Sequence, residues 1–206
     1  IISMQNQILC SWPEYNNAKL QQEIMLPIRW YCQKYCDRTL KINEMSDYRE
    51  ITSDICNKIS KMKTSFVHRD YHSRNIFLQD SKVKIIDFQD AVIGPFNYDL
   101  VSLLRDYYQP LSKDAVNKFI MHYYQNSAAK KYIKDMEVDS FIKTFHLTAL
   151  QRHLKVLGIF CRLKERDDKH NYIQYLPTVK QYIEDAIDEN KEYSKLLTIL
   201  KLDENI

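Results

Sequence analysis

Three polar side chains near the middle of the chain have the types and the spacing that phosphoryl transfer requires. Asp70 closes a His-Arg-Asp tripeptide, Asn75 follows it five residues later, and Asp87 precedes a phenylalanine. Phosphoryl transfer needs a group that accepts or orients the proton of the attacking hydroxyl, and it needs oxygen ligands for the Mg²⁺ that neutralises phosphate charge. Asp70 is the predicted catalytic residue, and Asn75 and Asp87 offer the hard oxygen atoms that Mg²⁺ prefers. The competing interpretation is a loop aspartate and a capping asparagine without a catalytic role.

Two short apolar runs, residues 76–79 and 83–87, are typical of β-strands, and the polar residues between them predict a tight turn. If the strands pair about Ser81, Asn75 lies directly opposite Asp87, at a Cα separation of about 4.5–5.5 Å. The aspartate of the His-Arg-Asp tripeptide lies on the loop that enters this hairpin. The spacing therefore predicts that the proposed base and both metal ligands meet where the apolar strands end.

The rest of the chain has mainly helical periodicity. Apolar residues recur at intervals of three and four in the first third of the chain and again after about residue 97. The expected early helices cover residues 18–25, 27–35 and 48–63. Breaks in the later helical pattern are expected near Pro110, residues 128–130, residues 167–169 and Pro177. These patterns predict a mainly α fold with one small β-hairpin, without internal repeats or a linker to a second compact domain.

Composition excludes several classes of protein. The 206 residues suit one domain, or one domain and part of another, and a formal net charge of +3 is too small to indicate a nucleic-acid partner. No apolar stretch approaches the ~18 residues of a membrane span, and the first residues lack the pattern of a signal peptide. We therefore expect a cytoplasmic protein with no membrane or nucleic-acid partner, and the sequence leaves its oligomeric state open.

The glycine and cysteine contents narrow the chemistry further. The chain has two glycines, Gly94 and Gly158, so it contains neither a G-x-G-x-x-G loop nor a Walker A loop for binding phosphates. Five cysteines occur without a C-x-x-C pair, at positions 10, 32, 36, 56 and 161. Cys32 and Cys36 would share a helix face, but a zinc site needs further ligands that the sequence does not offer. Buried free thiols in a reducing compartment are the favoured interpretation.

Beyond these patterns, the sequence resembles the aminoglycoside phosphotransferase and choline kinase family, and within it the bacterial anomeric kinases of N-acetylmuramate and N-acetylglucosamine that serve cell-wall recycling. The resemblance rests on residues 67–75, residues 86–91 with Gly94-Pro95, residues 98–106 and residues 151–160. Further residues resemble the family's connector after its nucleotide-binding lobe, namely Pro13, Tyr15, Glu23, Trp30 and Tyr31. Gln89 stands where a protein kinase has glycine, and no A-P-E segment follows, so the resemblance is not to protein kinases.

The resemblance implies the C-terminal lobe of a protein-kinase-like fold over residues 1–206. Within it, residues 1–40 would form the connector and first helices, residues 65–90 the catalytic loop and metal hairpin, and residues 97–206 a helical substrate subdomain. The family's N-terminal nucleotide lobe is expected to be absent from this chain. The implied cosubstrate and cofactor are ATP and Mg²⁺, and the implied partners are a nucleotide and a small sugar.

Other polar residues near these motifs are candidates for supporting or substrate-binding roles. His68 and Asp99 are expected to support the loop, and the resemblance implies that Asp99 accepts backbone N–H bonds; a charge favoured by the helix dipole is the alternative for Asp99. The substrate-binding candidates are His72, Arg74, Asp90, Arg105, Asp106 and Arg152. A sugar needs several hydrogen-bond partners, and an arginine would suit the carboxylate of acetylmuramate. Turn formation for Asp90 and ion pairs for the arginines stay open as alternatives.

The function predicted from the sequence is ATP- and Mg²⁺-dependent transfer of phosphate to an amino-sugar hydroxyl, at the anomeric position by resemblance. One alternative is a kinase for an aminoglycoside or a choline-like cation, which would need a more acidic cleft than the mixture of arginines and acids here indicates. The other alternative is a catalytically inactive truncated pseudokinase or interaction module, which the expected absence of a nucleotide lobe motivates.

Overall fold

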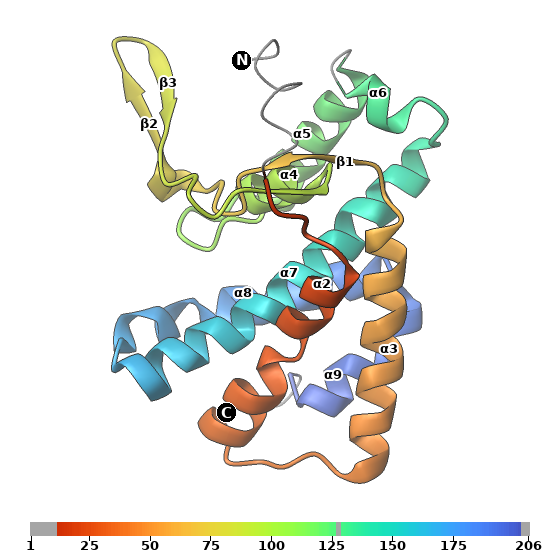
Figure 1. Ribbon diagram of the computed structural model, residues 1–206, viewed down its shortest axis with the longest axis vertical. Coiled ribbons are helices and arrows are strands. Elements are labelled where there is room, and N and C mark those ends of the chain that lie inside the picture. Colours follow the sequence, from red (N-terminus) through yellow and green to blue (C-terminus); the bar gives the residue numbers. More distant parts are fainter. Residues whose placement is uncertain (1–11, 127–128, 203–206) are drawn as a thin grey trace. The chain divides into compact units, whose positions relative to one another are not determined.

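A computed structural model of the protein, shown in Figure 1, describes residues 12–126 and 129–202. They belong to two compact units, each assembled from two separate stretches of the chain. The first unit comprises residues 1–16 and 60–145, and the second comprises residues 17–59 and 146–206. Apart from Arg152, all predicted site residues fall in the first unit. Among the helices described, none combines the length and the apolar character needed to cross a membrane.

A small antiparallel sheet in the first unit leads directly to the site. It pairs β1 (Thr64–Val67) with β4 (Val92–Pro95), and an isolated parallel bridge joins Glu14 to Ile93 of β4. The sequence patterns do not predict this sheet, so the expectation of a single hairpin among helices is incomplete. Each strand has four residues, which is too short for a clear alternation, and the two strands come together from distant parts of the chain.

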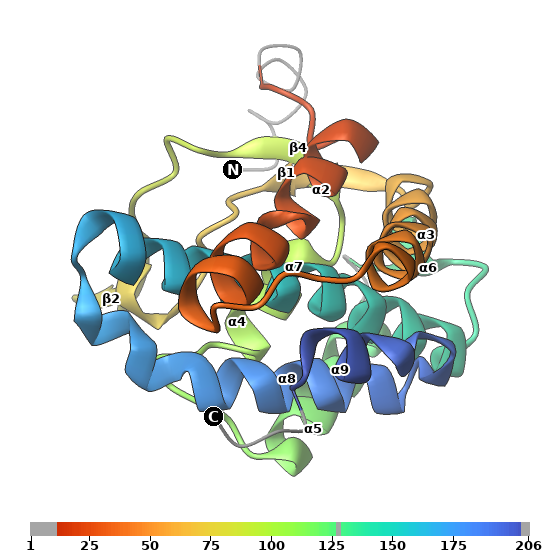
Figure 2. The ribbon, with the colours of Figure 1, turned by 90° about the horizontal axis from the view of Figure 1, so that it is seen from below.

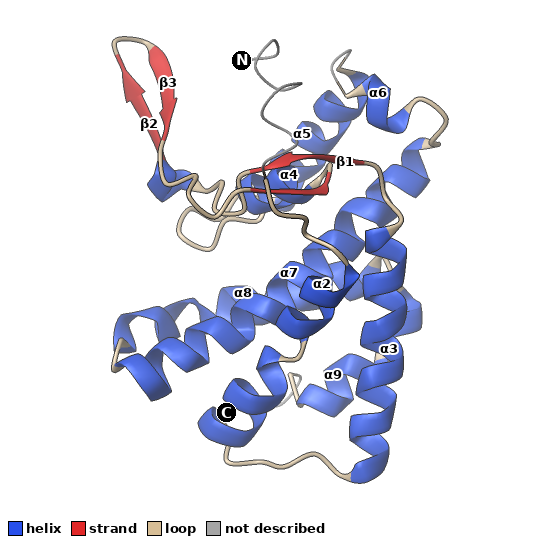
Figure 3. Ribbon diagram, in the orientation of Figure 1, coloured by secondary structure: helices blue, strands red, loops and turns tan. Residues whose placement is uncertain are grey.

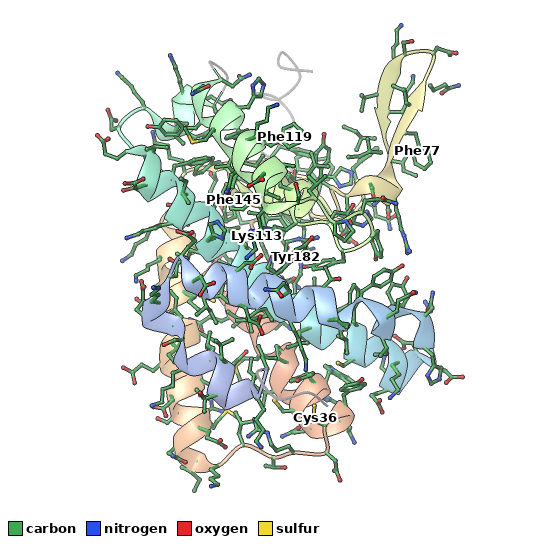
Figure 4. The ribbon with its side chains drawn as sticks, turned by 180° about the vertical axis from the view of Figure 1, so that it is seen from behind. Cys36, Phe77, Lys113, Phe119, Phe145 and Tyr182 are labelled. Atoms are coloured by element: carbon green, nitrogen blue, oxygen red, sulfur yellow. The ribbon has the colours of Figure 1, made fainter. Side chains whose placement is uncertain are left out.

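The second sheet is the predicted hairpin, formed by β2 (Ile76–Gln79) and β3 (Lys82–Ile85) after a short 3₁₀ helix, η3 (Ser73–Asn75) (Figure 3). Both strands occur where the apolar runs predict them. Their side chains are largely exposed: Phe77, labelled on β2 in Figure 4, is 50% exposed, and Leu78 is 77% exposed. The hairpin therefore adds little to the buried core, and its base is the part that adjoins the site.

The register of this hairpin differs from the predicted one by one residue. Leu78 lies opposite Val83, so the turn contains two residues, Asp80 and Ser81. Both have positive φ, 51° and 58°, as in the two-residue turns whose twist matches that of the flanking strands. The observed register also sets an aliphatic residue opposite Val83, where the predicted register would set Gln79. The predicted register is therefore wrong, and the two candidate metal ligands are not cross-strand partners.

Helices complete the described part of the first unit. They are α4 (Tyr98–Leu104), α5 (Lys113–Gln125), α6 (Lys130–Ile133) and the beginning of α7 (Val138–Asp167). The expected break near Pro110 lies between α4 and α5, and the break expected near residues 128–130 falls partly outside the described residues. Phe141 is fully buried and packs against the rings of Phe96 and Tyr123, with centroid distances of 6.3 and 5.9 Å. Packed aromatic rings therefore form part of the core of this unit.

The second unit is helical and can be followed in Figure 2. Its elements are α2 (Asn17–Ile24), the π-helix η2 (Ile28–Tyr35), α3 (Ile42–Ser60), the later part of α7, the 3₁₀ helix η4 (His170–Tyr175), α8 (Leu176–Asp188), the 3₁₀ helix η5 (Lys191–Tyr193) and α9 (Lys195–Leu200). The three predicted early helices are present, although α3 begins before the predicted start. Pro177 lies in the first turn of α8, where its missing N–H costs no helical hydrogen bond. On α7, Gly158 permits a close approach, because a Cβ there would lie 2.5 Å from the backbone of Leu26.

The cysteines within the described residues carry free thiols, as predicted. Cys32, Cys56 and Cys161 are buried and Cys36 is half-buried, whereas Cys10 lies outside the described residues. Burial raises the pKa of the Cys32 thiol to about 11 and that of the Cys56 thiol to about 12. These thiols therefore stay protonated near neutral pH.

Candidate active site

The site begins at the turn that leaves β1. After Val67, the backbone N–H groups of His68 and Arg69 donate to the carboxylate of Asp99, at 2.6 and 3.1 Å. Asp99 lies in the first turn of α4, where the helix dipole also favours a negative charge. Arg69 has a φ of 74°, so the chain bends sharply at the residue before Asp70. The hydrogen bonds that the resemblance implies for Asp99 are thus present, and they fix the start of the loop formed by residues 68–75.

The imidazole of His68 joins this loop to the segment that carries Asp87. His68 is 5% exposed, and its Nε2 atom lies 2.9 Å from the carbonyl oxygen of Ile86. A carbonyl oxygen only accepts, so Nε2 carries the proton and donates it. The ring of Tyr71 packs edge-on against this imidazole. Burial, together with the negative charge of Asp99, raises the pKa of Tyr71, so its hydroxyl stays protonated at neutral pH.

Asn75 is fixed by hydrogen bonds of both its side chain and its backbone. Its Nδ2 atom donates to the carbonyl oxygen of Asp70 at 3.0 Å, which leaves Oδ1 as the amide atom able to bind a metal. Its backbone N–H donates to the carbonyl of His72, and its own carbonyl accepts the N–H of Ile86 at 3.1 Å. The cross-strand neighbour of Asn75 is therefore Ile86, and the predicted opposition to Asp87 is wrong because the two-residue turn shifts the register.

The carboxylates of Asp70 and Asp87 differ from those of Asp99 and Asp106 because no described residue holds them in a hydrogen bond or an ion pair. Asp70 is half-buried and Asp87 is exposed. Asp87 has a φ of 66°, so the chain leaves the strand direction after β3. Proteins bind Mg²⁺ through one or two side-chain oxygens completed by waters and substrate phosphates. Residues 12–126 and 129–202 contain no cluster of three or more His, Cys, Asp or Glu that could hold a metal. The amide oxygen of Asn75 and the carboxylate of Asp87 are, by their chemistry, the type of ligand that suits a Mg²⁺ ion shared with phosphates.

A buried carboxylate on the chain just after α4 holds the other end of the 68–75 loop. Asp106 is 2% exposed, and its two oxygen atoms accept the backbone N–H groups of Ser73 at 2.7 Å and Tyr108 at 2.8 Å. The ring of Tyr108 lies 3.6 Å from the guanidinium of Arg74 and meets the imidazole of His72 edge-on at 5.2 Å. Sequence reasoning misses both Ser73 and Tyr108. The available signal is the aspartate two residues before Tyr108, because such a side chain commonly accepts the N–H two positions on.

The remaining substrate-binding candidates lie in different environments. Asp90 is exposed on a turn in which the N–H of Ala91 donates to the carbonyl of Phe88. Arg105 is 4% exposed at the C-terminal end of α4. Arg152 is also 4% exposed, but on α7 in the second unit. The structure therefore brings His72 and Arg74 against the ring of Tyr108, whose backbone N–H Asp106 accepts, and it places Asp90 on an exposed turn.

Comparison with known proteins bears on this geometry directly. A family model described as the phosphotransferase enzyme family matches residues 37–132, which include the 68–75 loop, the hairpin, α4 and Asp106. Over this segment the chain is similar to the phosphotransferase enzyme family, and the resemblance predicted from the sequence is confirmed.

Curated relatives extend the similarity over most of the chain. An N-acetylmuramate/N-acetylglucosamine kinase of Neisseria meningitidis serogroup B is 31% identical over 188 residues, which cover 91% of this chain and 56% of the relative. Kinases of the same name from Pseudomonas aeruginosa and Pseudomonas putida are 29% and 30% identical over 91% and 89% of this chain, and over 56% and 54% of their own lengths. The chain thus spans just over half the length of these relatives.

Proposed function

We propose that this chain is the catalytic and substrate-binding lobe of a kinase that transfers phosphate from ATP to an amino sugar, N-acetylmuramate or N-acetylglucosamine, at the anomeric hydroxyl. The observation that carries the proposal is the arrangement of Asp70 and Asn75, which a 3.0 Å hydrogen bond joins while no described residue engages the Asp70 carboxylate. The choice of substrate is supported by a relative named as a kinase of these two sugars, to which the chain is 31% identical over 91% of its length.

In this proposal each side chain of the site has a distinct task. The Asp70 carboxylate accepts or orients the proton of the sugar hydroxyl as phosphate is transferred. The Oδ1 atom of Asn75 and the carboxylate of Asp87 would hold Mg²⁺, which when bound would neutralise charge on the phosphates. Asp99 and His68 keep the loop in place through the hydrogen bonds described above.

The proposal assigns residues 1–40 to a connector with the first helices, residues 65–90 to the catalytic loop and metal hairpin, and residues 97–206 to a helical substrate subdomain. It needs a nucleotide-binding lobe outside residues 1–206. Of the substrate-binding candidates, Arg74 is the one we assign to an acidic group of the sugar, such as the carboxylate of acetylmuramate. A reaction that consumes ATP also favours the cytoplasm as its compartment.

The test is phosphate transfer by the complete gene product, purified and supplied with ATP and Mg²⁺. N-acetylmuramate and N-acetylglucosamine are compared with choline and an aminoglycoside as acceptors. Transfer to the anomeric hydroxyl removes the reducing end, so the product should fail to react in a reducing-sugar assay. Asp70→Asn should lower the rate by at least about 100-fold, since loss of a general base removes a factor of that order.

Asp80→Asn is the matched control, because the hairpin tip is exposed and asparagine tolerates its positive φ. Its rate and its unfolding midpoint should equal those of the unmodified protein. Undiminished transfer in the Asp70→Asn variant would overturn the assignment of the base. Transfer to choline or the aminoglycoside alone would replace the substrate, and absence of transfer to every acceptor would favour an interaction module.

A further inference from the structure

We propose that Asp106 is a positioning residue that sets the place of the metal ligand Asn75, by tying the turn of residues 72–75 to residues 106–108. This inference rests on the proposed function, since it assigns a role within the same reaction. It also departs from the sequence-based expectation that Asp106 contacts the substrate.

The hydrogen bonds of Asp106 support a positioning role over substrate contact. One carboxylate oxygen lies 2.7 Å from the backbone nitrogen of Ser73, and the other lies 2.8 Å from that of Tyr108. The side chain thus crosslinks two stretches of backbone. With 2% exposure and both oxygen atoms engaged by N–H groups, it presents little surface to a sugar. A carboxylate accepting backbone N–H groups forms strong, charge-assisted hydrogen bonds.

The ring of Tyr108 adds a second attachment between the same two segments. The Arg74 guanidinium lies 3.6 Å from the ring centroid, a distance typical of a cation–π contact, and His72 packs edge-on against the ring. Residues 106–108 therefore contact three consecutive residues of the turn. The side chains of His72 and Arg74 meet the ring of Tyr108, and the backbone N–H of Ser73 donates to Asp106.

A short chain of hydrogen bonds carries this attachment to the metal ligand. Ser73 is the first residue of the 3₁₀ helix that ends at Asn75, and the backbone N–H of Asn75 donates to the carbonyl of His72. A shift of Ser73 therefore moves the backbone of Asn75 and, with it, the side-chain amide that is the proposed metal ligand. Asp99 holds the opposite end of the loop, at His68, so loss of Asp106 should disturb the metal ligand more than the proposed base. Misplacement by about 1 Å can cost as much as 100-fold in rate.

The discriminating variant is Asp106→Asn in the complete gene product. The asparagine oxygen can accept one of the two N–H groups, whereas its NH₂ group would face the other donor. We expect the apparent KM for Mg²⁺ to rise about 10-fold and kcat to fall about 10-fold, while the sugar KM changes less than twofold. Asp114→Asn is the matched control, because Asp114 is exposed in the first turn of α5 and should change none of these values.

Backbone amide NMR provides a readout that does not depend on activity. In the Asp106→Asn variant the amide resonances of Ser73, Asn75 and Tyr108 should move, while those of His68 and Arg69, bonded to Asp99, should not. If the unmodified protein transfers no phosphate, the proposed function fails, and these amide shifts still test the positioning role separately.

A second variant covers the case in which Asp106→Asn does not fold. Tyr108→Leu keeps the backbone N–H but removes the ring beneath Arg74, and it should raise the apparent KM for Mg²⁺ by about threefold without changing the sugar KM. An unchanged Mg²⁺ requirement in the folded variants would overturn the inference. A raised sugar KM with an unchanged Mg²⁺ requirement would do so as well, because it would make Asp106 a substrate contact.

Discussion

Four aspartates of the first unit have the same type of side chain but lie in different surroundings. The outer pair, Asp70 and Asp87, has carboxylates that no described residue engages, whereas the inner pair, Asp99 and Asp106, accepts backbone N–H groups at both ends of the 68–75 loop. A carboxylate whose oxygens already accept such bonds has little capacity left for a metal or a substrate proton. The comparison teaches that the surroundings of an aspartate, more than its distance from a motif, separate chemistry from support.

The sharpest way to break this comparison is to remove a member of the outer pair. Asp87→Ala should lower phosphate transfer about 1,000-fold, because a metal ligand contributes several kcal/mol to stabilising the charge of the transition state. The unfolding midpoint should fall only slightly, because alanine tolerates the positive φ of this position less well than aspartate, whereas the side chain is exposed and no described residue bonds it. The rate is measured at saturating ATP, and the midpoint by thermal unfolding. A marked drop in the midpoint would move Asp87 into the supporting class.

The inner pair should behave in the opposite way. Asp99→Ala leaves the N–H groups of His68 and Arg69 without their acceptor, which should lower the free energy of unfolding by about 2 kcal/mol. The rate should fall by about 10- to 100-fold, because the loop that carries Asp70 loses its anchor. Urea unfolding and transfer assays measure the two effects. Asp114→Ala, an exposed charge in the first turn of α5, is the control and should cost less than about 0.5 kcal/mol. Full stability with a large loss of rate would contradict the division into two pairs.

The buried thiols extend the comparison to ionisable groups that burial alone keeps uncharged. The expected effect, on the rate of thiol modification, is the smallest of those predicted. Burial raises the pKa of Cys56 to about 12, so its folded form keeps the proton that an unfolded thiol loses near pH 8.5. The stabilisation that this raised pKa provides is complete below about pH 8.5 and decreases as the pH rises toward 12. At pH 8, iodoacetamide should therefore modify Cys56 at least about 10-fold more slowly than the half-buried Cys36, as followed by peptide mass spectrometry. Equal rates of modification would show that α3, which carries Cys56, opens readily.

The fold could be predicted where structure is local. The helices near residues 18–25 and 27–35 and both strands of the hairpin follow from periodicity and short-range turn signals. The pairing of β1 with β4 could not be predicted, because hydrogen bonds between distant four-residue segments leave no local pattern. The hairpin register was missed for a different reason: Asp80 and Ser81 both take positive φ, which is unusual for residues other than glycine.

The site divides in the same way. The motif spacing predicts the closeness of Asp70 and Asn75, which share a hydrogen bond. The resemblance points to Asp99 as an acceptor of backbone N–H groups. Nothing local reveals the bond of Asp106 to Ser73, since it depends on how the chain after α4 returns to Ser73. The same long-range return places Tyr108 beside Arg74.

The two-residue turn of the hairpin restricts how evolution can change its length. Asp80 and Ser81 occupy the whole turn, so one added residue must alter the turn type or displace one strand by a residue. A displaced β3 would carry Ile86 and Asp87 with it and separate Ile86 from the Asn75 carbonyl. One residue added to each arm would instead lengthen the hairpin and leave its base intact. Natural homologues should therefore differ at this tip in steps of two residues, and an odd difference should be accompanied by a different turn or a bulge.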